Sequence, residues 1–389
     1  MSELVRQEIL ATAELIVVKV GTRVLTRADG TLDDERVASI AGQLARQWQA
    51  GRRMVLVSSG AVGAGLGRLQ LKQRPTAVSQ LQAAAAIGQS LLIEAYNRAL
   101  EPHQLHAAQV LLTAEDLQDR SRYLNVRNAL FAMFEMGAVP IINENDTVSV
   151  DELQLSFGDN DRLAALVTNL VRAPLLVLLS DIDGLYDGDP DDAETKVLSV
   201  VTDLANAQEQ HVCDGKREGK QLSKGGMATK LQAVQIVTSA GENVVIANGH
   251  RDTVLDEVLA GADVGTLFLA EGPAVTPRKR WIGWSANPAG KLMLDAGACS
   301  AIETKGRSLL AVGVAQVDGN FTKGDVVALC DEAGREFARG LINYSATEMR
   351  TIAGQAKERI AELLGHRPYE VVVHRNNLVV LSSSPDSST

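Results

Sequence analysis

The sequence predicts an α/β fold, a three-layer sandwich in which helices cover both faces of a mainly parallel sheet, followed by a small β-rich domain. Through the first two thirds of the chain, short β-branched runs alternate with longer helical patterns, an order typical of parallel sheets. Beyond Gly290 the pattern changes to short strands broken by Gly, Asp and Asn turns. A chain of 389 residues exceeds what one hydrophobic core usually organises, so we expect two domains.

We expect the strands of the first domain at short runs rich in valine, isoleucine and leucine. These runs cover residues 15–20, 54–58, 107–112, 139–143, 175–179, 243–247 and 266–269. Between the first two, residues 33–50 place Val37, Ile40 and Leu44 on one stripe at helical spacing. This spacing predicts a helix that packs on the sheet.

The boundary between the domains is expected near residue 271, where three prolines and two tryptophans accompany the basic triplet Arg278–Arg280. We expect a large first domain over residues 1–271, a linker over 272–289 and a second domain over 290–389. The triplet is expected to be solvated. An amphipathic pattern predicts one helix over 346–364, and the low-complexity tail 382–389 is expected to fray.

Charge and cysteine content exclude several classes of protein. The net charge is −10 and the pI about 5.2, which argues against wrapping of nucleic acid or adsorption to an anionic membrane, since both need a basic face. Cys213, Cys299 and Cys330 lie far apart and suggest neither a disulfide framework nor a zinc site. The N-terminus shows no secretory signal, so we expect a reducing, cytoplasmic location.

Two glycine-containing turns follow predicted strands in the first quarter of the chain. Lys19 ends the first strand and Gly21 follows it, an arrangement in which a lysine and backbone amides can approach an anion; the alternative is a solvated edge lysine. Ser59 lies in a Ser-Ser-Gly turn after the second strand, suited to a carboxylate or phosphate. A plain strand-to-helix turn is the alternative there. No Walker A motif occurs.

Two further turns carry carboxylates, amides and lysines. Residues 143–146 read Asn-Glu-Asn-Asp, and Asn160 and Asp161 follow shortly at the start of a helix. Such clusters suit an ammonium group and the orientation of nearby lysines, although helix capping is the alternative. Residues 224–230, Lys-Gly-Gly-Met-Ala-Thr-Lys, open another helix whose amides and dipole suit a phosphate. The alternative is a flexible lysine-rich loop.

Together these turns are suited to phosphoryl transfer, which needs in-line placement and neutralisation of charge. Lys19 and Lys230 are expected to flank the β- and γ-phosphates of ATP, with Asp161 holding both lysines in place. A carboxylate acceptor is already ionised at neutral pH, so no general base is needed. Mg²⁺ is expected to be held largely by water and ATP itself, and no protein metal site is expected.

In chain order, VVKVGT, SSGAVGAG, INENDTV, FGDND, LLSDIDGLYDGDP and GGMATK resemble the amino acid kinase superfamily. INEND followed by GDND is most similar to its glutamate-phosphorylating branch. The C-terminal run from GKLMLDAGACSAI to GLINYSATEMRTIAG resembles a PUA domain. The resemblance implies an amino acid kinase fold joined to a PUA domain.

The resemblance also implies roles for individual residues. Lys19 and Lys230 would contact ATP phosphates, Asp161 would organise the lysines, and Ser180 and Asp181 would lie near the nucleotide. The residues that would bind glutamate are Ser59, Asp146 and Asn160. The loop that would close over the nucleotide comprises Lys224, Gly225, Gly226, Met227, Ala228, Thr229 and Lys230. The chain departs from the family pattern at Lys224 and Ser180, where threonine is expected in both cases.

The implied product is γ-glutamyl phosphate, the first intermediate from glutamate to proline, with proline as feedback inhibitor and a homodimer or homotetramer as the assembly. A kinase for another small amino acid carboxylate is one alternative. An RNA-associated protein is another, because PUA domains bind RNA. Residues 290–389 contain 11 Lys and Arg against 12 Asp and Glu, which is no electrostatic footprint for RNA.

Overall fold

A computed structural model describes residues 2–27, 29–71, 73–148, 159–189, 192, 194–204, 207, 224–272, 274–365 and 369–381. The chain forms two compact units, each with its own sheet and core. The first comprises Met1–Asp116 and Ser121–Ala274, and the second comprises Leu117–Arg120 and Val275–Thr389. Cys213 lies outside the described residues. None of the helices in the described part combines the length and apolar content that a bilayer crossing requires.

The first unit is built on an eight-stranded sheet in the order β3-β4-β2-β1-β5-β7-β8-β6. Its strands are β1 Leu15–Val20, β2 Arg53–Ser58, β3 His106–Leu112, β4 Ala138–Glu144, β5 Leu175–Ser180, β6 Val200–Val201, β7 Asn243–Asn248 and β8 Thr266–Phe268. Every neighbouring pair is parallel except β7 and β8. The predicted mainly parallel sheet and its seven strands are confirmed, whereas the two-residue strand β6 was missed.

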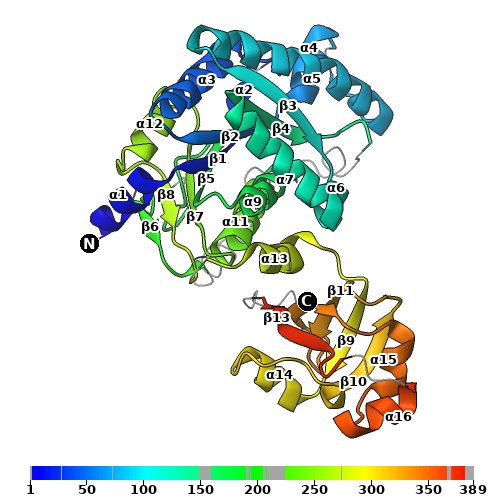
Figure 1. The fold of residues 1–389 in the computed structure, drawn as a ribbon. Helices are drawn as coiled ribbons and strands as arrows, with labels where there is room; N and C mark the ends of the chain where they lie inside the picture. The colour runs from blue at the N-terminus through cyan, green and yellow to red at the C-terminus, as the bar shows by residue number, and fades with distance from the viewer. Residues whose placement is uncertain are drawn as a thin grey trace. The chain divides into compact units, whose positions relative to one another are not determined.

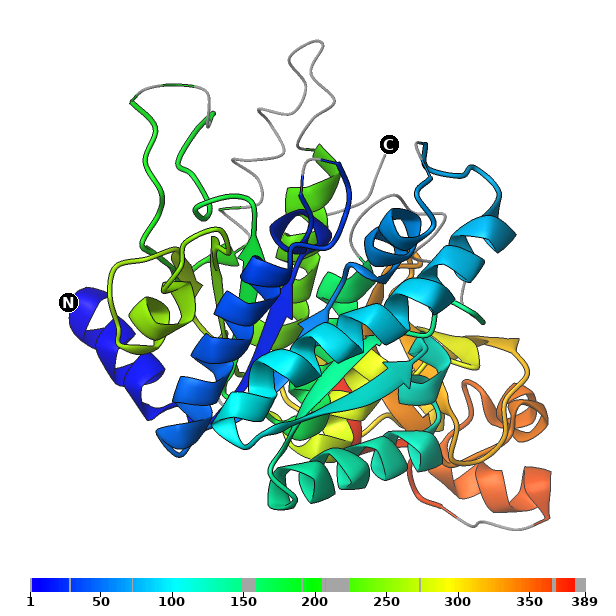
Figure 2. The same cartoon turned by 90° about the horizontal axis from the view of Figure 1, so that it is seen from above.

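Helices cover both faces of this sheet, as Figures 1 and 2 show. On one face lie α3 Asp34–Gln49, α5 Val78–Leu100 and α12 Val254–Leu259; on the other lie α7 Arg120–Glu135, α9 Asp159–Val171 and α11 Lys224–Thr238. Asp33 caps α3 by accepting hydrogen bonds from the amides of Glu35 and Arg36, and Val37, Ile40 and Leu44 are buried against the sheet. The three predicted layers are therefore confirmed.

The parallel strands bring distant segments to one edge of the sheet. β1 lies between β2 and β5, with Val20 in register with Ser58 and Leu179, and Ser180 is in register with Asn248 on β7. Because these strands run in the same direction, the turns that follow them share the carboxyl edge, where open α/β sheets bind ligands.

The second unit contains a five-stranded sheet in the order β10-β9-β11-β12-β13. Its strands are β9 Gly290–Leu294, β10 Val314–Gly319, β11 Val326–Cys330, β12 Glu336–Ile342 and β13 Val373–Val380, and its helices include α14 Ala296–Glu303, α15 Ala346–Ile352 and α16 Ile360–Leu364. A separate core, including Leu292, Leu329 and Phe337, fills the space between sheet and helices. The predicted small β-rich domain is confirmed.

Two expectations for this unit were wrong. The single helix predicted over residues 346–364 ends at Ile352, and α16 begins only at Ile360, because Gly354 adopts φ 72°, a left-handed conformation that terminates helices. The basic triplet is not solvated throughout: Arg280 is 0% exposed and its Nε donates to the Val275 carbonyl at 2.8 Å. The tail 382–389 lies outside the described residues.

Candidate active site

Two lysines from distant parts of the chain converge on one carboxylate. Lys19 Nζ, on β1, lies 2.6 Å from Asp161 Oδ1, and Lys230 Nζ, in the second turn of α11, lies 3.3 Å from Asp161 Oδ2. Lys19 is 6% exposed, Asp161 1% and Lys230 9%. Thr229 Oγ1 also donates to Asp161 Oδ2 at 3.3 Å. We call Lys19, Asp161 and Lys230 the charged cluster.

The charged cluster contains two cations and one anion, so it holds an excess positive charge away from water. Burial opposes ionisation of Asp161, but the two lysines outweigh burial and hold its pKa below its ordinary value. Burial lowers the pKa of Lys230, and the nearby Lys19 adds to that effect, although Asp161 opposes it. A buried excess of positive charge is stabilised by an anion, and phosphate oxygens are suited to both lysines.

A second cluster, of neutral side chains, links the turn after β2, the end of β4 and α5 to α9. Asn160 Nδ2 donates to Ser59 Oγ at 2.9 Å and to Asn143 Oδ1 at 3.0 Å. Asn143 Nδ2 donates in turn to Gln89 Oε1 on α5 at 2.9 Å. All four side chains are buried. We call Ser59, Gln89, Asn143 and Asn160 the amide cluster.

The first turn of α9 joins the two clusters. Asn160 belongs to the amide cluster and Asp161, the next residue, to the charged cluster. Consecutive Cα atoms lie about 3.8 Å apart, so the two clusters are anchored next to each other on α9. The sequence predicted this convergence of Lys19, Ser59, Asn160, Asp161 and Lys230 at the edge of the sheet.

A third group of predicted residues follows β1 and β5. The Gly21 amide donates to the Leu179 carbonyl at 3.1 Å, which ties the first turn to the end of β5. Ser180 Oγ donates to Asp181 Oδ1 at 3.0 Å, and Arg23 Nη1 donates to Asp181 Oδ2 at 2.8 Å. Burial opposes ionisation of Asp181, but these hydrogen bonds, led by that from Arg23, hold its pKa below its ordinary value.

The remaining predicted residues begin α11 or follow β4. Lys224 and Gly225 begin the helix, and the Lys224 side chain is outside the described part of the structure. Gly226 accepts from Lys230 Nζ at 3.2 Å through its carbonyl, Met227 is half-buried and Ala228 is exposed. Asp146 is buried in the turn after β4.

Comparison with known proteins identifies the family behind this geometry. Residues 14–248 match the amino acid kinase family. The chain belongs to the amino acid kinase family. Residues 290–364 match the PUA domain, and the resemblance predicted from the motifs is confirmed.

Close relatives extend over nearly the whole amino acid kinase chain. A glutamate 5-kinase of Rhodopirellula baltica is 50% identical over 376 residues, which cover 97% of this chain and 96% of that protein. A glutamate 5-kinase of Moorella thermoacetica is 45% identical over 372 residues, 96% of this chain and 97% of the relative. Among solved structures, a carbamate kinase from Giardia lamblia bound to AMP-PNP matches 67% of this chain and 100% of its own at 16% identity, with a TM-score of 0.47.

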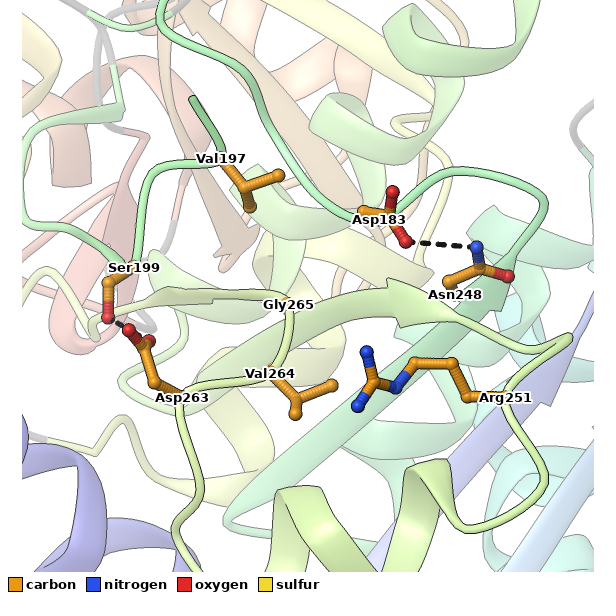
Figure 3. Close-up of a pocket in the computed structure, with 8 residues that line it drawn as sticks. All are labelled: Asp183, Val197, Ser199, Asn248, Arg251, Asp263, Val264 and Gly265. Atoms are coloured by element: carbon orange, nitrogen blue, oxygen red, sulfur yellow. Dashed lines mark hydrogen bonds between the residues drawn. The ribbon is translucent and has the colours of Figure 1, made fainter. Parts of the chain in front are cut away.

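A cavity of about 240 Å³ lies beside the Ser180–Asp181 turn of this amino acid kinase, and the described residues that line it include none of the predicted site residues. Figure 3 shows Asp183 and Asn248 on one side and Gly265 on the other, and Asn248 Nδ2 donates to Asp183 Oδ1 at 2.9 Å. Arg6 is fully buried and donates to the carbonyls of Ser199 and Gly265 at 2.9 and 3.3 Å. The N-terminal helix α1, Ser2–Thr12, therefore braces one wall of the cavity.

Sequence reasoning missed two further residues of the site. Gln89 belongs to the amide cluster, and Arg23 reaches Asp181 from α2, Thr22–Leu25. The available signal for Gln89 was a polar residue that follows Gly88 in an alanine-rich helix. Arg23 carried no comparable signal, because its contact depends on how β1 and β5 pair.

Proposed function

We propose that this amino acid kinase is a glutamate 5-kinase, which transfers the γ-phosphoryl group of ATP to the γ-carboxylate of L-glutamate. The observation that carries the proposal is the junction of the charged cluster and the amide cluster at Asn160 and Asp161. The relatives named glutamate 5-kinase support the choice of substrate. The product is γ-glutamyl phosphate, so the enzyme catalyses the first step of proline biosynthesis.

The charged cluster neutralises the transferred phosphoryl group. Lys19 and Lys230 contact the β- and γ-phosphates, while Asp161 holds the two lysines in place. An oxygen of the γ-carboxylate attacks the γ-phosphorus, the bond from that phosphorus to the β,γ-bridging oxygen breaks, and ADP leaves with the bond's electron pair. The acceptor is ionised before the reaction, so no proton is removed from it. Excess positive charge favours the transition state, in which negative charge spreads over the transferred group.

The amide cluster and the turn after β4 bind the acceptor. Ser59 and Asn160 provide neutral polar contacts, and the Asp146 carboxylate is suited to the α-ammonium group of a free amino acid. This preference disfavours acylated substrates. The choice of glutamate over aspartate follows the relatives, and a kinase for another small amino acid carboxylate remains the alternative.

The nucleotide is bound by the turn after β1, the turn after β5 and the start of α11. In this proposal Gly21 brings backbone amides to the phosphates, Ser180 and Asp181 lie near the nucleotide, and the segment from Lys224 to Lys230 covers it. Within the described residues, no three His, Cys, Asp or Glu side chains form a metal site, and Asp161 and Asp181 are engaged by cations. Mg²⁺ binds mainly through water and substrate phosphates, so we expect it to arrive on ATP and to keep those ligands.

Several further properties belong to the same proposal. We expect proline to act as feedback inhibitor, the protein to be a homodimer or homotetramer, and its location to be cytoplasmic. The residue boundaries 1–271, 272–289 and 290–389 remain our division of the chain. The PUA domain is expected to be structural or regulatory, because its balanced charge does not favour RNA.

The test is to trap the acyl phosphate. Purified protein is incubated with Mg-ATP, hydroxylamine and, separately, L-glutamate, L-aspartate or N-acetylglutamate, while hydroxamate and ADP are measured. We expect hydroxamate from glutamate alone, lost in Lys19→Ala and Lys230→Ala but retained in Lys305→Ala, a control at an exposed lysine of the second unit. If a folded protein that binds ATP yields no hydroxamate with any acid, the proposed function is wrong.

A further inference from the structure

Gln89 joins the amide cluster from α5, a helix that contains none of the site motifs. Its side chain lies on α5 and is 7% exposed. Its Oε1 accepts the hydrogen bond from Asn143 Nδ2 at 2.9 Å. Asn143 in turn accepts from Asn160, so Gln89 is the outermost member of a relay that ends at Ser59.

The position of Gln89 is fixed by close contact between α5 and α4, Ala61–Arg68. A Cβ added at Gly88 would lie 1.8 Å from the Ala61 carbonyl oxygen, and one added at Gly65 would lie 1.8 Å from that of Ala84. The two backbones therefore touch beside Gln89. α4 begins directly after Gly60, whose φ of 108° shapes the Ser59 turn, so the helix contact links Gln89 to that turn.

A second contact anchors the same face of α5. Tyr96, two turns beyond Gln89, is fully buried and shares a hydrogen bond with Ser58 Oγ at 3.0 Å. Residues seven apart lie on one face of a helix. This face of α5 thus carries two buried polar side chains that hydrogen-bond to the ends of β2 and β4.

The Gln89 amide has N–H donors that no described residue accepts. Nε2 of Gln89 is buried and has no hydrogen-bond partner among the described residues. Both N–H groups of Asn160 are engaged, with Ser59 and with Asn143. Buried amide donors without an acceptor are rare in native proteins and call for a ligand or water as partner.

We propose that Gln89 is a specificity-determining residue of the acceptor site, which donates an N–H to a carboxylate oxygen of the amino-acid substrate while its Oε1 fixes the Asn143 amide. This inference rests on the proposed function, because it requires an acceptor that carries carboxylates. A carboxylate accepts hydrogen bonds through both oxygens and donates none, which matches the unused donor.

Two isosteric substitutions separate the donor role from the positioning role. Gln89→Glu retains an oxygen acceptor for Asn143 but replaces the N–H donor by a second oxygen that repels a carboxylate. Gln89→Met removes both functions at similar volume. If Gln89 only positioned Asn143, Gln89→Glu would behave as wild type and Gln89→Met would be impaired. If it donates to the substrate, both variants are impaired and Gln89→Glu more severely.

The experiment measures KM for L-glutamate and for ATP, kcat and the thermal midpoint for both variants and for Gln80→Glu, a matched control at an exposed position of the same helix. We expect KM for glutamate to rise at least 30-fold in Gln89→Glu and about 10-fold in Gln89→Met. KM for ATP should stay within about twofold and Gln80→Glu should match wild type.

Three results would overturn the inference. The first is a Gln89→Glu enzyme with the wild-type KM for glutamate. The second is an equal rise of both KM values together with a lower thermal midpoint, which indicates general damage to the fold. The third is a wild-type enzyme that makes no hydroxamate from glutamate, which would remove the proposed function itself; the first two results would leave that function standing.

Discussion

The charged cluster and the amide cluster meet at adjacent residues of α9 but are stabilised in opposite ways. In the charged cluster, Lys19 and Lys230 share Asp161 and keep one positive charge in excess. In the amide cluster, Asn160, Asn143 and Gln89 hydrogen-bond in series without any ionised group. The charged cluster depends on the balance of charges, whereas the amide cluster depends on the direction in which each amide points.

This difference assigns each cluster to a different task. Excess charge favours a multiply charged phosphate and its transition state and tolerates small changes of position, because Coulomb attraction falls slowly with distance. Oriented amides favour one ligand shape, because hydrogen bonds weaken steeply when they are misaligned. We therefore expect mutations in the charged cluster to lower kcat, and mutations in the amide cluster to raise KM for the acceptor.

The largest effect is expected for Asp161→Asn, which leaves two buried lysines without their anion. We expect kcat to fall by about 10²–10³-fold, and the free energy of unfolding to fall by about 3 kcal/mol or more, as for other buried ion pairs that lose one partner. Steady-state kinetics and urea unfolding measure both. Asp256→Asn, which removes a partly exposed ion pair with Arg46, should change kcat and the free energy of unfolding only slightly. If this control loses as much of both as Asp161→Asn, the role assigned to Asp161 is wrong.

The corresponding change in the amide cluster is Asn160→Ala. This substitution removes the amide that donates to Ser59 and Asn143. KM for glutamate should therefore rise by about 10–100-fold, as expected when a site loses hydrogen bonds to its ligand. kcat should change less than in Asp161→Asn. The difference between the two clusters is contradicted if Asn160→Ala lowers kcat as strongly as Asp161→Asn does and leaves KM for glutamate unchanged.

The scaffold behind the amide cluster is tested by Gly88→Ala. The new Cβ would overlap the Ala61 carbonyl, so the free energy of unfolding should fall by about 1–3 kcal/mol or more. Gly42→Ala is the matched control, since the nearest described atom to its Cβ in α3 would be Arg46 Nη1 at 3.5 Å and helix propensity favours alanine by about 1 kcal/mol. Thermal unfolding of both variants checks this; equal stability would contradict the tight contact between α4 and α5.

The lowered pKa of Lys230 in the charged cluster should appear in the pH dependence of kcat/KM for ATP. Because burial lowers the pKa of Lys230, this lysine loses its proton at a lower pH than an ordinary lysine, whose pKa is about 10.4. kcat/KM for ATP should therefore fall as pH rises, with a midpoint below that value. Lys230→Arg should lose this alkaline limb, because arginine stays protonated. A wild-type profile that is flat up to pH 10 would oppose the prediction.

The smallest effect is expected for Arg23→Ala at the rim of the site. The pair between Arg23 and Asp181 is partly exposed, and such pairs contribute little, about 0–1 kcal/mol. We expect KM for ATP to rise by about two- to fivefold, less at high salt, which screens the pair. Kinetics at two ionic strengths measure this, and a change of KM for glutamate instead would place Asp181 on the acceptor side.

Much of the site was predictable because it lies where sequence patterns are strongest. Strand runs locate the carboxyl edge of a parallel sheet, and glycine-rich turns beside Lys19, Ser59 and the residues before Lys230 identify what lies there. The helix over 346–364 was predicted wrongly because a single residue, Gly354, overrides an otherwise continuous amphipathic pattern. Arg280 was misjudged because a buried guanidinium whose Nε donates to a carbonyl looks like any other basic residue in sequence.

The sequence by itself determined the two domains, the parallel sheet and the set of lysines, carboxylates and amides that follow its strands, since hydrophobic period and turn chemistry are local properties. Only the tertiary structure decided that Gln89 hydrogen-bonds to Asn143 and that Arg23 reaches Asp181. Those contacts depend on strand order and on the close approach of α4 to α5. Both arise from packing between segments far apart in the chain, for which a single sequence carries no local signal.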